Sequence, residues 1–202
     1  MSMFSKDSGK GSNTTIIPKN TLAMGILHVD EVRESKNTSG KYLQATVTIT
    51  SGQYKARRIP FNRFPVLTDT KNSEKWREMG LVDLTRIMES GGFFDPADAA
   101  SYSKLESAFA KTAETQDHQH AIAAIGLAID GAVVGIRTGI DKSDDGDNEY
   151  TSVAEWLTPN PDSHGFRNWK KLHETPAQET PAAGDAPPAA KAESGAASWL
   201  GN

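Results

Sequence analysis

The ten residues Lys41–Thr50 constrain the fold more than any other segment, because their polarity alternates without a break. Alternation at period two over this length is typical of a β-strand with one face toward a core. The dipeptide Ser51-Gly52 follows and predicts a tight reversal, so we expect Gln53–Phe61 to return as the second arm of a hairpin. One face of the first arm carries Leu43, Ala45, Val47 and Ile49, and the other Tyr42, Gln44, Thr46 and Thr48.

A further strand precedes this hairpin and helical spacing follows it. Thr21–Arg33 has a β-branched, alternating centre, which makes three consecutive strands. Ser73 then resembles an N-cap before apolar residues at helical spacing that end at Gly91-Gly92. Second and third helical segments are expected after Asp95-Pro96 and over His118–Ile129.

Strand signals return after the helical insertion. Ala132–Ile140 and Glu149–Leu157 alternate again and flank the Asp-rich turn Ser143–Asn148. The chain is therefore predicted to be mainly β with a helical insertion. Five strands with helices between the third and fourth correspond to the plan of an OB-fold-like barrel, an order that other small barrels and α+β folds share.

Composition divides the chain into a domain and two arms. Residues 1–20 are polar and rich in Ser, Gly and Lys, which predicts a flexible N-terminal arm. Residues 173–202 are rich in Ala and Pro and are predicted to be a disordered tail, leaving one domain over residues 21–172. Trp199 and Leu200 near the end of the tail are interpreted either as a short peptide that docks in a partner's groove or as part of a plain spacer.

Charge is distributed unevenly along the sequence. The formal net charge is −4, yet residues 1–77 contain 13 Lys and Arg against 6 acids, and the remainder contains 9 against 20. The excess of positive charge in the first part favours contact with a polyanion. No apolar run approaches the roughly 18 to 20 residues that span a bilayer, so we expect a soluble, unsecreted protein without a membrane partner.

The first hairpin combines cations with aromatic side chains. Lys41–Phe64 contains no acid, whereas a single-strand-binding surface needs positive charge for phosphates and rings on which bases stack. Tyr54 and Lys55 lie on opposite faces of the third strand, and its sequence leaves open which face meets a ligand. An ordinary exposed sheet face with partly buried aromatics is the alternative. The candidate residues here are Lys41, Tyr42, Tyr54, Lys55, Arg57, Arg58, Phe61 and Arg63.

The second hairpin offers two more candidates. Arg137 lies between Gly135 and Gly139 on one face, where missing side chains would leave room for a base or a sugar-phosphate. Trp156 shares a face with Tyr150 and would either extend the stacking surface or belong to the core.

The sequence contains no strong motif for an enzyme active site. The chain has no cysteine, and Asp141–Asp147 fails as a calcium loop because Ser152 stands where the twelfth-position Glu would be. There is no phosphate-binding P-loop. We therefore expect no catalytic residues, no metal and no cofactor, and keep a metal-dependent nuclease at Asp141–Asp147 as a minor alternative.

Several short segments resemble phage-encoded single-stranded DNA-binding proteins, which are OB-fold proteins of tailed bacteriophages. The resemblance extends over Thr21–Pro159 and is carried by Gly40–Leu43, Ser51–Arg58, Val133–Thr138 and Asp145–Asn148. It implies sequence-independent binding of single-stranded DNA during phage replication, recombination or repair, in the cytoplasm of the bacterial host. It also implies a tail that recruits replication or recombination proteins, although this tail is less acidic than those of bacterial single-strand-binding proteins and lacks their final Phe.

The alternative function is a phage protein–protein interaction module whose basic hairpin docks an acidic partner. A homo-oligomer is compatible with either function.

Overall fold

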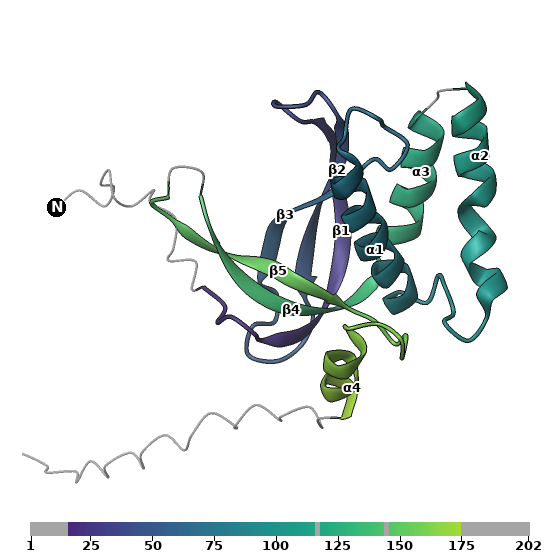
Figure 1. Cartoon of the computed structure of the whole chain (residues 1–202). Coiled ribbons are helices and arrows are strands. Elements are labelled where there is room, and N and C mark those ends of the chain that lie inside the picture. The colour runs from purple at the N-terminus through teal and green to yellow at the C-terminus, as the bar shows by residue number, and fades with distance from the viewer. Residues whose placement is uncertain (1–15, 116–117, 144–145, 175–202) are drawn as a thin grey trace, which may run out of the picture.

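The fold is built on one antiparallel sheet of five strands (Figure 1). The computed structural model describes residues 16–115, 118–143 and 146–174. The strands lie in the order β3-β2-β1-β4-β5, so the first strand is the centre of the sheet. Their bounds are β1 Leu22–Glu34, β2 Lys41–Ile49, β3 Arg58–Pro65, β4 Val133–Lys142 and β5 Glu149–Leu157.

The helical insertion lies between β3 and β4, as the sequence predicts. Ser73 caps the first helix by accepting a hydrogen bond from the Trp76 N–H at 3.3 Å, and Gly92 follows the helix with a φ of +74°. Figure 1 shows the inserted helices gathered on one side of the sheet, with a last helix apart from them near β4 and β5. The helices are α1 Glu74–Ser90, the 3₁₀ helix η1 Ala99–Leu105, α2 Glu106–Thr115, α3 His118–Ile129 and α4 Phe166–Glu174.

The sheet is not closed into a barrel. β3 and β5 are its two edges, and no ladder of hydrogen bonds joins them within the described residues. They approach each other through side chains instead, with the rings of Phe64 and Trp156 5.5 Å apart. The prediction of a five-stranded barrel therefore holds for the number and sequence order of the strands, but not for closure.

The third strand begins later than the sequence pattern indicates. Two residues with positive φ, Gly52 at +74° and Ala56 at +67°, make Ser51–Arg57 a wide turn instead of a two-residue reversal. The Ala56 N–H still donates to the Ile49 carbonyl, at 2.8 Å, so the turn closes the hairpin. The predicted strand Gln53–Phe61 is thus displaced to Arg58–Pro65.

Both faces of β2 are buried, although only one is apolar. Its apolar face, with Val47 and Ile49, enters the core, while Tyr42 on the other face packs against Trp76 at the start of α1, with ring centroids 6.2 Å apart. Thr46 is satisfied there by donating to an Asp30 carboxylate oxygen at 2.8 Å. An alternating pattern therefore distinguishes the two faces without identifying which one meets water.

The predicted domain boundaries shift at both ends. Ile17 is buried and its N–H donates to the Thr151 hydroxyl at 2.9 Å, so the folded part begins before Thr21. At the other end, His173 and Glu174 belong to α4 and not to the tail. The rest of the predicted tail, with Trp199 and Leu200, lies outside the described residues.

Candidate functional site

A cleft of about 180 Å³ lies between the two edge strands. Its floor is formed by Phe64 of β3 and Trp156 of β5, which are buried and pack on each other. One wall is the segment Pro60–Arg63 and the other is the outer part of β5. The cleft therefore exists because the sheet stops short of closing.

A β-bulge in β3 shapes the first wall. Ala45 pairs with Asn62 and Val47 with Ile59, so Pro60 and Phe61 together oppose one residue of β2. Pro60 has no N–H to donate, and the Asn62 side chain donates instead to the Ala45 carbonyl at 3.2 Å and the Ile59 carbonyl at 2.8 Å.

Phe61 is held in an unusual position by this bulge. Its φ is +65°, a left-handed conformation uncommon for an aromatic residue, and its side chain is 56% exposed at the cleft. Such conformations cost of order 1–3 kcal/mol and collect at binding sites. The bulge therefore presents a large apolar ring to solvent where an ordinary ladder would not.

Tyr150 and Arg63 complete the rim. Tyr150 is an exposed aromatic on β5 that lines the cleft opposite the bulge. Arg63 is exposed on β3, and its guanidinium lies over the Tyr42 ring, 5.7 Å from the centroid. Arg58, also exposed, begins the same strand. Phe61, Arg63 and Tyr150 thus line one cleft, and Arg58 lies outside it at the start of β3; these four exposed residues are called the β3–β5 strip.

Two carboxylates line the same cleft, Asp83 from α1 and Asp141 from β4. Burial raises the pKa of Asp83, and Arg86, whose guanidinium is 4.0 Å from the carboxylate, opposes that shift. Carboxylates repel phosphates but accept hydrogen bonds from amino groups of bases. The interior of the cleft therefore suits a base edge better than a phosphate.

Four predicted residues lie near the turn and strand ends and do not line the cleft. Tyr54 is half-buried against the core, Lys55 is exposed, and Arg57 is half-buried and has a partner. Lys41, half-exposed at the start of β2, donates its backbone N–H to an Asp69 carboxylate oxygen at 2.8 Å. This contact, together with the Lys71 N–H, overcomes the effect of burial and lowers the pKa of Asp69.

The structure gives Tyr42 and Trp156 packing positions. Tyr42 is 8% exposed beneath Trp76 and Arg63, and Trp156 is 5% exposed in the floor of the cleft. Neither presents a ring face to solvent as Phe61 does. For Trp156 the core alternative is the one that the structure favours.

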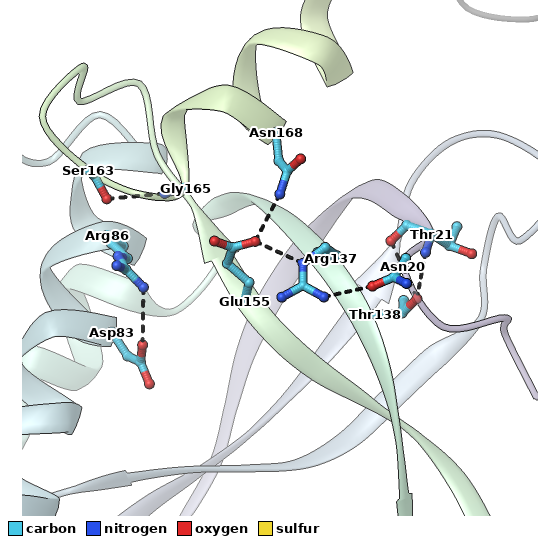
Figure 2. Close-up of polar contacts among 10 residues, drawn as sticks. All are labelled: Asn20, Thr21, Asp83, Arg86, Arg137, Thr138, Glu155, Ser163, Gly165 and Asn168. Carbon is cyan, nitrogen blue, oxygen red and sulfur yellow. Dashed lines mark hydrogen bonds and ion pairs between the residues drawn. The ribbon is translucent and has the colours of Figure 1, made fainter.

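Arg137 is engaged by other side chains (Figure 2). Its Nε donates to Glu155 at 2.8 Å and its Nη1 donates to Asn20 at 2.8 Å, while Asn168 of α4 donates to the same Glu155 oxygen. The open space predicted beside it at Gly135 is filled by Trp169 of α4, whose ring would stand 3.0 Å from a Cβ there. This face of β4 is an attachment surface for α4 and the chain before β1.

Sequence reasoning missed two features of the cleft. The first is the bulge that exposes Phe61, where the Asn62 side chain donates to two backbone carbonyls. Pro60 could have indicated it, because proline within a strand is found at edges and bulges. Asp83 comes from a helix that the sequence does not place against the strands.

The described residues contain no group of three or more His, Asp or Glu side chains that could hold a metal ion. In the same part of the chain, no helix combines the length and apolar content that crossing a membrane requires. In comparisons with known proteins, no family model matches the chain and no curated protein matches it significantly.

Proposed function

We propose that this protein binds single-stranded DNA without sequence specificity, along the strip between β3 and β5, in phage DNA replication, recombination or repair. Phe61 and Tyr150 stack on bases, Arg58 and Arg63 contact phosphates, and the cleft accepts base edges. The observation that carries the proposal is Phe61, a 56% exposed ring in a left-handed conformation at the mouth of the cleft.

The open sheet supports the same interpretation. The strand order β3-β2-β1-β4-β5 brings β3 and β5 together as edges, as expected for an OB-like barrel left open between its third and fifth strands. A partly open barrel leaves a groove in which a flexible strand can lie with its bases turned inward and its phosphates outward. A duplex hides its base faces by stacking and pairing, so it would not use the rings.

A direct titration tests the proposal. We expect a labelled oligo-dT of about 16 nucleotides, the upper site size of one OB fold, to bind more tightly than a duplex of equal length. Contacts of Arg58 and Arg63 to two phosphates would give a slope of log K against log salt of about −1.4. If neither DNA binds below micromolar concentration at moderate salt, the alternative replaces this proposal, with the basic hairpin docking an acidic protein.

A further inference from the structure

A second cleft lies on the helical side of the molecule and is lined by other residues of α1 than Asp83, which lines the cleft between β3 and β5. It has a volume of about 380 Å³ between α1, η1 and α2. Its floor consists of Leu84, Met88 and Phe94, which are buried, and Phe109 forms part of its wall. Leu81 of α1 also lines it and is 54% exposed.

The lining determines what can fill this cleft. Thr85, Tyr102 and Glu106 are its polar members, and the Tyr102 hydroxyl is already used, donating to Glu89 at 2.6 Å. The remaining surface is aliphatic and aromatic, and the volume falls in the range of sites that hold drug-sized ligands or an anchoring side chain. An occupant must therefore supply a large apolar group and little charge.

The chain itself contains such a group. Between residues 175 and 202, Trp199 and Leu200 are the large apolar side chains, and the rest is mainly Ala, Pro, Gly and polar residues. Tryptophan is the residue most enriched among binding hot spots, and an adjacent leucine adds aliphatic area. The intervening residues supply no competing anchor.

The tether is long enough for the two residues to reach the cleft. Twenty-four residues separate Glu174, the end of α4, from Trp199. Extended, they span up to about 80 Å, whereas a domain of this size has a radius of gyration near 15 Å. A tether of suitable length gives the peptide at its end an effective concentration of up to about millimolar.

From these observations we propose that Trp199 and Leu200 dock into the α1–η1–α2 cleft of their own chain. The indole fills the space over Leu84, Met88 and Phe94, and Leu200 covers the exposed part of Leu81. The contact is independent of the β3–β5 strip, so it stands whether or not the protein binds DNA.

The absence of cysteine allows a disulfide test in the full-length protein. Thr85→Cys places a thiol in the cleft and Gly201→Cys places one beside Leu200, leaving every apolar residue intact. We expect the intramolecular disulfide to form about tenfold faster than in the control pair Leu127→Cys with Gly201→Cys, since Leu127 is 83% exposed on α3 and does not line the cleft. Adding Trp199→Ala and Leu200→Ala should remove the difference.

Equal rates for the two pairs would overturn the proposal, and so would a product that is mainly a disulfide-linked dimer, which would identify a second copy as the occupant. A second measurement needs no cysteine. Hydrogen exchange of the full-length protein should be faster in α2 after Trp199→Ala with Leu200→Ala than in the wild type. Unchanged exchange in α2 would also contradict the proposal.

Discussion

At the scale of single residues, side chains with the same predicted role differ in how exposed they are. Tyr42 and Phe61 are both aromatic and both lie in the acid-free segment, yet Tyr42 is 8% exposed and Phe61 is 56% exposed. The difference comes from the Asn62 contacts that stabilise a bulge at Phe61 and from the helix that covers Tyr42. Arginines divide in the same way, since Arg63 is exposed at the cleft while Arg137 is bound by Glu155 and Asn20.

The two arginines should behave differently when replaced. Arg63→Ala removes a proposed phosphate contact, so we expect weaker oligo-dT binding and a salt slope smaller by about 0.7. Arg137→Ala should lower the free energy of unfolding, because its guanidinium donates hydrogen bonds to Glu155 and Asn20. The salt slope should not change, because these contacts are within the protein. Anisotropy titrations at several salt concentrations and urea unfolding of both variants provide the check. A reduced slope for Arg137→Ala alone would contradict these assignments.

The raised pKa of Asp83 predicts a pH dependence of binding. Burial raises this pKa and Arg86 partly opposes the shift, so Asp83 takes up its proton at a higher pH than an ordinary aspartate. Thymine has no amino group to donate to the carboxylate, so for oligo-dT this charge acts by repelling the phosphates. As the pH falls below neutral, its loss should therefore raise the affinity for oligo-dT. Asp83→Asn should bind as tightly at pH 7 as the wild type does at low pH. Parallel pH profiles for the two proteins would mean that Asp83 does not face the bound DNA.

At the scale of elements, one buried carboxylate joins three segments. Glu89 near the end of α1 is 3% exposed and accepts hydrogen bonds from Tyr102 of η1 at 2.6 Å and from Thr158 and Asn160 just after β5. A buried carboxylate without partners would be costly, so the three donors are what permit it. The contacts attach the inserted helices to the end of the sheet's last strand.

Alkaline unfolding tests this junction. Burial, reinforced by Glu89, raises the pKa of Tyr102 from 10.0 to about 12. The unfolded chain therefore loses this proton first, so the contribution of Tyr102 is complete below pH 10 and is lost as the pH rises toward 12. Tyr102→Phe should lower the free energy of unfolding at pH 7 by about 1–3 kcal/mol and weaken its decline above pH 10. Identical alkaline profiles for the variant and the wild type would exclude this role.

The attachment of α4 can be tested with a pair of glycines. A Cβ at Gly135 would meet the Trp169 ring at 3.0 Å and Leu157 at 3.2 Å, whereas one at Gly126 in α3 meets nothing within 4 Å. Gly135→Ala should lower the free energy of unfolding by about 1–3 kcal/mol, and Gly126→Ala should raise it by up to about 1 kcal/mol. Urea denaturation of the two variants measures both changes. A neutral Gly135→Ala would mean that α4 does not pack closely on β4.

At the scale of the whole molecule, local sequence patterns predicted most helices and strands. Which side chains are buried, paired or exposed depends on contacts between residues that are distant in sequence. Strand and helix segments such as His118–Ile129 and Glu149–Leu157 follow directly from periodicity. The position of β3 did not, because Ala56 adopts a positive φ without the glycine that would signal it. The openness of the sheet, the burial of Tyr42 and the pairing of Arg137 depend on elements far along the chain, which a single sequence does not place together.

The whole arrangement puts the apolar cleft of the helices and the β3–β5 strip in different parts of one small domain. The excess of positive charge before residue 78 contributes Arg58 and Arg63 to the strip. The acidic remainder contributes Asp83 and Asp141 to the cleft beside these arginines, so the charge division of the sequence does not separate two surfaces of the fold.

The measurement that tests the central claim most directly is an anisotropy titration of labelled oligo-dT with wild-type protein and with Phe61→Ala. A stacked base contributes about 1–3 kcal/mol, so the account predicts a loss of affinity of roughly 5- to 150-fold with unchanged thermal stability. Leu127→Ala, which removes an exposed apolar side chain of α3 outside the cleft, is the matched control and should leave the affinity unchanged. Equal affinity of folded Phe61→Ala and wild type would contradict the account.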